Sequence, residues 1–241
     1  MEKTLMASSL MPTLPLQIAE RIGVLIIEEK LRPGERLKEV ALAKDFQVSR
    51  ATIREALRIL ELRSLVSIIP QRGAQVTKLS SRELEDLFEM RAVLLGLVSR
   101  RVALNYSPDV KRRLYAGYDK LRAAKGNASA YARASAEMVA ELTRLCGNQQ
   151  LAEYIADFAL RIGRYARLGL IRPQRRAQSL LHWGRLLRAI AARDAALAET
   201  IHRRLSTQNQ VAALAELERR ERDEHAATTR ARRSPPAPTK N

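Results

Sequence analysis

Residues 48–60 read Val-Ser-Arg-Ala-Thr-Ile-Arg-Glu-Ala-Leu-Arg-Ile-Leu, and this stretch decides the fold of the N-terminal part of the chain. Ile53, Leu57 and Leu60 recur at helical spacing and form one apolar face. Ser49 stands directly before this pattern, where its hydroxyl caps a free backbone N–H group of the first turn. The stretch therefore predicts a helix over 50–63 that packs one face on a core and leaves the other face free.

The free face of this helix is basic. Arg50, Arg54 and Arg58 are spaced at i, i+4 and i+8, opposite the apolar positions. Such a stripe reaches DNA phosphates and, through bidentate hydrogen bonds, the O6 and N7 atoms of guanine. Ala51 and Thr52 occupy the first turn, where a methyl or hydroxyl group reads base edges. The alternative is a solvated charged face with no partner, and the neighbouring segments argue against it.

The segments on either side complete a DNA-binding arrangement. They are expected to form a helix from 16 to a turn at 32–34, a short helix over 38–46, and two strands at 65–69 and 74–77 joined by a turn. This order is that of a winged helix-turn-helix, in which the capped helix enters the major groove. Arg72 stands at the tip of the hairpin, where it suits contact with the DNA backbone or the minor groove.

Beyond Lys78 the chain reads as consecutive helices dominated by Ala, Leu, Arg and Glu. This part is expected to form six helices. The capping and turn residues that separate them are at 80–83, 107–108, 126–127, 147–148, 172–173 and 194. We therefore predict a mostly α protein with a small β-hairpin wing. Its expected parts are an N-terminal arm at 1–15, a winged helix-turn-helix domain at 16–78, an all-α antiparallel bundle at 79–225 and a disordered basic tail at 226–241.

Composition limits the partner and the cellular compartment. The 241 residues include 43 Lys and Arg against 26 Asp and Glu, a formal charge of +17 that favours phosphate polymers and anionic membranes. Cys146 is the only cysteine, which excludes an intramolecular disulfide and agrees with a reducing cytoplasm. Residues 1–15 do not resemble a secretory signal, and no apolar run approaches the roughly 20 residues that span a bilayer. We expect a soluble cytoplasmic protein with no membrane partner, and nucleic acid is the first partner to test.

The N-terminal motifs resemble the GntR family of bacterial regulators in order, spacing and identity. The matching segments are Leu-Arg-Pro-Gly-Glu-Arg-Leu at 31–37, Leu-Ala at 42–43, Val-Ser-Arg-Ala-Thr-Ile-Arg-Glu-Ala-Leu at 48–57 and Gln-Arg-Gly-Ala at 71–74. The resemblance implies DNA contacts by Ser49, Arg50, Thr52, Arg54, Arg72 and Gly73, to which the helix pattern adds Ala51 and Arg58. Gln47 and Ser64 stand where the family usually has glycine, and Ala51-Thr52 replaces a Thr-Pro-like pair. These departures concern the operator sequence and not DNA binding itself.

The helical part resembles the effector domain of the FadR subfamily, an FCD-type domain, which implies that residues 79–225 bind an effector and form the dimer. The matching segments are Asp-Leu-Phe-Glu-Met-Arg at 86–91 and Gly-Asn-Gln-Gln-Leu at 147–151. Many such domains hold a divalent metal with one Asp and three His, and those positions fall here on Ser135, Val139, Trp183 and Leu205. These side chains are poor metal ligands, so we predict no metal and no other cofactor. His182 and His202 lie close to two of the positions, and a shift in the alignment would restore two ligands.

Without a metal, the side chains available for recognising a small carboxylate or sugar acid are cationic. Arg91 shares the spacing of the apolar residues around it, and a buried arginine needs either a nearby glutamate or the carboxylate of a ligand. Arg161 and Arg164 belong to a second basic set that either faces a cavity or adds surface charge. Trp183 is expected to pack in the space that a metal would occupy. The predicted effector residues are Arg91, Ser135, Val139, Arg161, Arg164 and Trp183.

Two functions from different classes stay open. The favoured one is a sequence-specific regulator, a homodimer that represses from a pseudo-palindromic double-stranded operator and is released by a small organic acid. The alternative is a ligand-independent, nucleoid-type DNA-binding protein with a degenerate effector domain. A large ratio of specific to nonspecific affinity identifies the regulator. An enzyme is not expected, because the sequence offers no nucleophile–base pair, paired carboxylates or phosphate loop.

Overall fold

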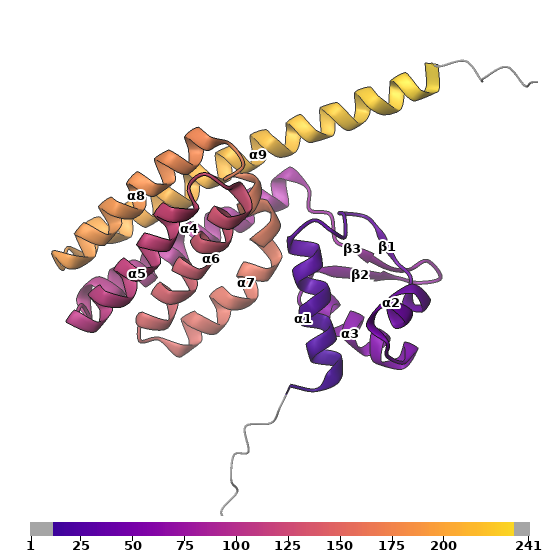
Figure 1. Ribbon diagram of the computed structural model, residues 1–241, viewed down its shortest axis with the longest axis horizontal. Helices are drawn as coiled ribbons and strands as arrows, with labels where there is room; N and C mark the ends of the chain where they lie inside the picture. The colour runs from indigo at the N-terminus through magenta and orange to yellow at the C-terminus, as the bar shows by residue number, and fades with distance from the viewer. Residues whose placement is uncertain (1–11, 234–241) are drawn as a thin grey trace, which may run out of the picture. The chain divides into compact units, whose positions relative to one another are not determined.

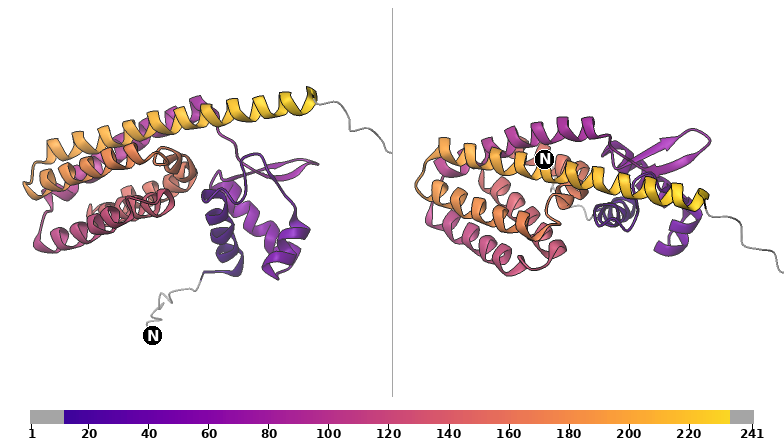
Figure 2. Two further views of the ribbon diagram at one scale, coloured as in Figure 1. Left: turned by 45° about the horizontal axis from the view of Figure 1, so that its top comes forward. Right: turned by 90° about the horizontal axis from the view of Figure 1, so that it is seen from above.

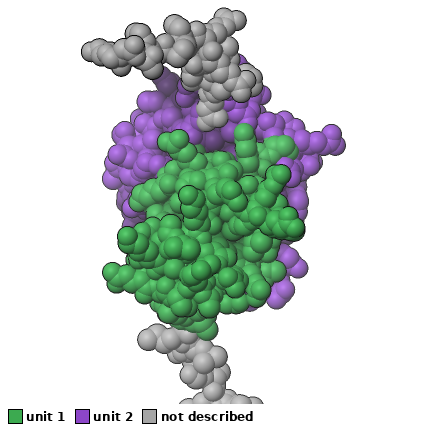
Figure 3. Space-filling model, turned by 90° about the vertical axis from the view of Figure 1, so that its right-hand side faces the viewer, with its two compact units in different colours: residues 1–80, 157–164 green, residues 81–156, 165–241 purple. Residues whose placement is uncertain are grey.

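The computed structural model of the protein describes residues 12–233, which contain nine α-helices and three short strands (Figure 1). These residues form two compact units. Unit 1 comprises the chain up to Ser80 together with Asp157–Arg164, and unit 2 comprises Ser81–Ala156 and the chain from Tyr165 onward (Figure 3). The predicted mostly α fold with a winged helix-turn-helix is confirmed.

Unit 1 contains the winged helix-turn-helix. Its elements are α1 (Leu14–Ile27), β1 (Arg36–Leu37), α2 (Glu39–Phe46), α3 (Arg50–Leu62), β2 (Val66–Ile69) and β3 (Gly73–Val76). Gln47 ends α2 in the left-handed region with a φ of 56°, which redirects the chain into α3. The core is formed by the apolar faces of α1 and α3 and includes Ile18, Ile22, Ile53 and Leu57.

The sheet of unit 1 has one more strand than the sequence predicted. Its order is β1-β3-β2 with antiparallel pairing throughout, and its registers include Leu37 opposite Ala74 and Val66 opposite Val76. The two residues of β1 are too few to show the period-two alternation that marks a strand in a sequence. Their pairing with β3 attaches the segment before α2 to the wing.

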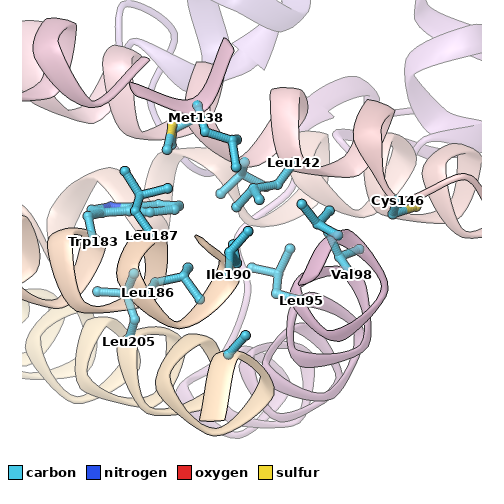
Figure 4. Packing of buried hydrophobic residues seen from close by; sticks show 14 of the residues in the cluster. Leu95, Val98, Met138, Leu142, Cys146, Trp183, Leu186, Leu187, Ile190 and Leu205 are labelled. Carbon is cyan, nitrogen blue, oxygen red and sulfur yellow. The ribbon is translucent and has the colours of Figure 1, made fainter. Parts of the chain in front are cut away.

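Unit 2 is a helical bundle built from α4 (Ser81–Leu104), α5 (Pro108–Ala124), α6 (Ala128–Leu145), the outer parts of α7 (Gln149–Leu168), α8 (Pro173–Ala191) and α9 (Ala195–Arg233). Side chains of Ser107, Asn127 and Asn148 cap α5, α6 and α7 by accepting hydrogen bonds from backbone N–H groups. Helix α4 packs mainly on α9. Figure 4 shows the apolar side chains of α4, α6, α8 and α9 pointing into a shared interior.

Two predicted boundaries need correction. Asp157–Arg164, in the middle of α7, belongs with unit 1, although its place in the chain suggested the helical domain. The tail predicted at 226–241 is wrong for its first part, because α9 continues to Arg233 and runs past the other helices of its unit (Figure 2). Few apolar residues argue against a packed core, but the alanines and arginines of this stretch still favour a helix.

The outermost residues of the predicted arm and tail, 1–11 and 234–241, lie outside the described part of the chain. Leu14 and Pro15, which the sequence assigned to the arm, already belong to α1. Pro15 lies in the first helical turn, where a missing N–H group costs no hydrogen bond. Among residues 12–233, no helix is both long and apolar enough to cross a membrane.

Candidate functional site

The start of α3 is held by a side-chain cap. The backbone N–H of Thr52 donates to Oγ of Ser49 at 3.1 Å, which confirms the predicted N-cap. The Thr52 hydroxyl lies 2.8 Å from the same Ser49 oxygen. The hydroxyl groups of Ser49 and Thr52 are therefore bonded to each other, and the Thr52 methyl group is the part not engaged in this contact.

The basic face of α3 lies in solvent. Arg50, Arg54 and Arg58 are exposed, while Ile53 and Leu57 on the opposite face are buried. The predicted amphipathic helix is therefore confirmed, and its arginines are accessible to a large anionic partner. Their assignment as DNA contacts stays a prediction, because it depends on the bound DNA.

Glu39, at the start of α2, organises two of these arginines, and the sequence analysis missed it. Nη2 of Arg54 donates to Oε2 of Glu39 at 3.1 Å, and Nη2 of Arg50 lies 4.0 Å from the same oxygen. The hydrogen bond to Glu39 raises the pKa of Arg54. The sequence signal for Glu39 is an acidic side chain in the first turn of α2, the helix that precedes α3. Glu39 thus fixes the guanidinium of Arg54 on the exposed face of α3.

The wing presents its basic tip on a constrained backbone. Arg72 is exposed, and Nε of Arg36 on β1 donates to the Arg72 carbonyl oxygen at 3.1 Å. Gly73 has a φ of 81°, a conformation that residues with a Cβ rarely adopt. Arg72 and Gly73 thus occupy the tip of the β2–β3 hairpin, as the sequence predicted.

The second basic set belongs to unit 1, whereas Arg91 belongs to unit 2. Arg161 and Arg164 lie in the segment of α7 that belongs to unit 1, where Arg164 donates to the backbone carbonyl of Thr77. In the same segment, a Cβ added to Gly163 would lie 3.5 Å from Ile27 of α1, so the two helices approach closely. Four of the six predicted effector residues belong to unit 2 and two to unit 1, and their shared role stays a prediction. Helix α7 contributes residues to both units, and the sequence pattern alone does not predict this.

A polar group lies inside unit 2, where α4, α8 and α9 meet. Nδ1 of His202 lies 2.5 Å from Oγ of Ser99, and both residues are fully buried. Nη1 of Arg91 donates to Oγ of Ser206 at 3.3 Å. The ring of Trp183 meets that of His202 edge to face, with 5.3 Å between the centroids. We call Arg91, Ser99, Trp183, His202 and Ser206 the interior polar cluster.

Charge in the interior polar cluster is concentrated on Arg91. Burial lowers the pKa of Arg91 to about 10, so the side chain stays a cation at neutral pH. Burial and the nearby Arg91 charge lower the pKa of His202 to about 3, so the imidazole is neutral. The hydrogen bond of Arg91 goes to a hydroxyl group instead of the glutamate considered from the sequence. Nε1 of Trp183 is also buried without a hydrogen-bond acceptor in the described structure. The cluster thus offers N–H donors and a positive charge to an anion.

Arg175, at the start of α8, is a second buried cation that the sequence analysis missed. It donates to the carbonyl oxygens of Gln208 at 3.3 Å and Leu205 at 3.5 Å, while Nη1 has no hydrogen-bond partner among the described residues. Burial lowers its pKa, and burial also raises the pKa of the neighbouring Tyr131 to about 12. The local sequence carries no signal for Arg175, because its surroundings come from α6 and α9.

The four positions of the family's metal ligands do not fit a divalent ion. Val139, Trp183 and Leu205 are buried in the apolar core of unit 2, and Ser135 on α6 is half-buried. Their side chains offer a single hydroxyl oxygen and no imidazole or carboxylate. The described part of the chain contains no group of three or more His, Cys, Asp or Glu side chains that could hold a metal.

Two family models match the chain in the order of its two units. The model for the bacterial regulatory proteins of the gntR family matches residues 14–76, and the FCD domain model matches residues 86–208. The chain belongs to the GntR family. It is a helix-turn-helix transcriptional regulator with an FCD effector domain, and this family consists of regulators and not of enzymes.

Relatives of this GntR regulator resemble it over different parts of its length. YdhC, an HTH-type transcriptional regulator of Bacillus subtilis, is 35% identical over 79 residues, which are 33% of this chain and 35% of YdhC. BphR of Paraburkholderia xenovorans is 27% identical over 194 residues, or 76% of each chain. The gluconate operon transcriptional repressor of B. subtilis is 29% identical over 97 residues, or 40% of each chain.

Solved structures show the same fold. The E. coli protein McbR/YncC superposes with a TM-score of 0.76 and 22% identity, covering 86% of this chain and all of that one. A GntR regulator from Rhodococcus superposes with a TM-score of 0.67 and 21% identity, covering 85% of this chain and 97% of that one. At this level of identity the likeness concerns architecture alone.

Proposed function

We propose that this GntR regulator is a homodimeric repressor whose affinity for its operator changes when a small organic acid binds inside the FCD domain. The proposal places the protein in the bacterial cytoplasm, where it meets the chromosome. Ser49, Arg50, Ala51, Thr52, Arg54 and Arg58 on α3 contact the major groove, with Arg72 and Gly73 of the wing beside it. The repressor role draws support from the relative named gluconate operon transcriptional repressor.

The observation that carries the acid effector is the charge of the half-buried Arg91, whose pKa is lowered by its burial to about 10. Its hydrogen-bond partner is the neutral hydroxyl of Ser206, and among the described groups that shift its pKa there is no carboxylate. A buried cation without an anionic partner is unfavourable, and a ligand carboxylate supplies that partner. Nε1 of Trp183 lacks an acceptor, and this N–H donor favours an anion over a cation. We therefore assign the effector carboxylate to Arg91 without an intervening metal.

Ligand binding and DNA binding are coupled if the acid has different affinities for the DNA-competent and DNA-incompetent arrangements. An acid held by Arg91 contacts α4, which begins at Ser81 directly after the winged helix-turn-helix domain. For the acid to relieve repression, its binding must weaken the affinity of the protein for the operator.

A thermal-shift screen against small carboxylates and sugar acids tests the effector, with and without added zinc and after chelation. We expect one acid to raise the melting temperature equally in all three conditions and to weaken operator binding in a fluorescence anisotropy assay. Arg91→Met removes the charge but keeps much of the side-chain volume, and it should abolish the shift. The exposed Arg112→Met on α5 is the matched control and should retain it.

Three other outcomes would contradict the proposal. Stabilisation that requires zinc would show that metal ligands exist after all. A shift that survives Arg91→Met would place the acid elsewhere. If no acid has any effect and the protein binds all DNA sequences alike, the ligand-independent DNA-binding alternative is favoured.

A further inference from the structure

A hollow lies between α8 and α9, on the sides of these helices that face away from the interior of unit 2. The two helices pack side by side (Figure 1), and their inner sides carry the buried Trp183 and His202. Their outer sides enclose a space of about 550 Å³, whose lining includes Ala189, Leu197 and Ile201. We call this space the outer hollow. It is distinct from the interior polar cluster, because no residue of that cluster is part of its lining.

Three arginines surround the outer hollow. Arg185 and Arg188 come from α8 and Arg204 comes from α9, and all three side chains are exposed. Arg185 and Arg188 are spaced at i and i+3, so both lie on one face of α8. The lining includes one acid, Asp194. Three guanidinium groups against one carboxylate leave the outer hollow with a net charge of +2.

The acids beside the outer hollow have other partners. Glu199 pairs with Arg203 at 2.9 Å and with Arg100 at 3.5 Å. Oδ1 of Asp194 accepts a hydrogen bond from the backbone N–H of Leu197 at 3.0 Å and caps the first turn of α9. Within residues 12–233, the ion pairs include none of the three arginines of the outer hollow. Their guanidinium groups are therefore available to an external anion.

The half-buried His182 on α8 shows that these charges converge. Burial, together with the charges of Arg175, Arg185 and Arg204, lowers the pKa of His182. Arg185 and Arg204 belong to the outer hollow, and they approach the same imidazole from two different helices. The packing of α8 on α9 therefore brings cations that are far apart in the sequence to one place, where they attract the same anion.

The size and chemistry of the outer hollow select its occupant. Its volume lies in the range of about 300–1,000 Å³ that is usual for small-molecule sites. Arginine binds phosphate through paired hydrogen bonds, and the charge of a phosphate monoester, about −1.5 to −2 at neutral pH, balances the lining. The apolar floor at Ala189, Leu197 and Ile201 suits a hydrocarbon or aromatic body. A second copy of this chain fits poorly, because a two-fold axis would bring the same arginines face to face.

We propose that the outer hollow binds a small organic phosphate and is a second ligand site of the helical unit. The three arginines hold the phosphate group, and the apolar floor holds the organic body. This site is independent of the carboxylate that the proposed function assigns to Arg91. Because α8 and α9 carry the outer hollow on one side and Trp183 and His202 on the other, ligands at the two places contact the same helices.

The test measures binding of phenyl phosphate to the full chain by isothermal titration calorimetry. We expect a dissociation constant of about 1 mM or lower, and binding about tenfold weaker for inorganic phosphate, which lacks the organic body. Thr200→Glu places a carboxylate in the outer hollow and should weaken phenyl phosphate binding about tenfold or more. Thr207→Glu is the matched control and should change the constant less than about threefold. Both threonines are exposed on α9 and donate to a carbonyl of their own helix, at 2.9 Å and 3.1 Å, but Thr207 lies outside the lining.

Removal of charge gives an independent test. R188M/R204M keeps much of the side-chain volume but removes two of the three cations, and it should weaken phenyl phosphate binding about tenfold or more. R112M/R122M removes two exposed arginines of α5 and is the matched control that should retain binding. Arg91→Met should also retain it, because the interior polar cluster is not the site. Circular dichroism checks that every variant keeps its helical content.

The outcomes separate the outer hollow from the proposed effector site. Binding that survives R188M/R204M and is lost in Arg91→Met would place phenyl phosphate in the interior polar cluster, which overturns the outer site and leaves the proposed function intact. Equal affinities for inorganic phosphate and phenyl phosphate would overturn an organic ligand. No binding at about 10 mM phenyl phosphate would overturn the small-molecule site altogether. If R188M/R204M then reduces the salt dependence of DNA binding, the arginines serve nucleic acid instead.

Discussion

On α3, the side chains of Arg50 and Arg54 lie in solvent, whereas in the helical unit Arg91 is half-buried and Arg175 is buried. An exposed arginine keeps its hydration, and salt screens its charge, so its presence costs the fold little. A buried arginine loses its hydration, which is why burial lowers the pKa of both Arg91 and Arg175. The exposed set is suited to a large external anion and the buried set to a small one that enters the fold.

The largest effect that tests this comparison concerns the packing around the buried set. Trp183 is 1% exposed beside His202, and Trp183→Ala should cost about 3–5 kcal/mol of the unfolding free energy of the helical unit. Leu181→Ala, at an exposed site on the same helix, should cost less than about 0.5 kcal/mol. Because Trp183 is the only tryptophan, unfolding is followed by far-UV circular dichroism in urea. Equal losses in the two variants would show that the interior is loosely packed.

The exposed set should behave in the opposite way. Arg54→Ala should weaken operator binding about 10- to 100-fold through the loss of DNA contacts. It should leave the melting temperature almost unchanged, because the exposed ion pair with Glu39 contributes little to stability. Arg112→Ala on α5 provides a matched loss of one exposed charge and should change the affinity much less. Fluorescence anisotropy at a fixed salt concentration measures both variants. A loss of stability in Arg54→Ala would show that the ion pair with Glu39 stabilises the fold as well as positioning Arg54.

The two regions also differ in how far the sequence predicts them. The cap of α3, its apolar face and its arginine stripe are set by neighbours within a few residues, so helical spacing alone located them. The surroundings of Arg91 and Arg175 come from helices distant in the chain, and neither Ser206 as the partner of Arg91 nor the carbonyl contacts of Arg175 followed from spacing. Family resemblance located the replaced metal positions. The charge pattern placed Arg164 among the candidate effector residues, whereas in the structure its side chain donates to the backbone carbonyl of Thr77.

A pH titration sharpens the contrast inside the helical unit. The pKa of His202 falls from 6.5 to about 3 on folding, so the unfolded chain binds the proton more readily than the folded one. Stability from this residue is complete above pH 6.5 and is lost as the pH falls, by about 2 kcal/mol at pH 5. His202→Gln should flatten this part of the profile, measured by urea unfolding between pH 7 and pH 5. An unchanged slope would mean that His202 takes up its proton in the folded protein.

The smallest expected effect is at the start of α3, where the fold and the exposed set meet. Ser49→Ala removes the acceptor for the Thr52 N–H group and should cost about 1 kcal/mol of unfolding free energy. Ser49→Asn keeps a capping oxygen and should restore most of that stability. If Ser49 also contacts DNA, Ser49→Asn should still weaken operator binding, whereas a residue that acts only as a cap would bind as the unmodified protein does. Paired urea unfolding and anisotropy measurements on the two variants therefore separate the cap from the DNA contact at one position.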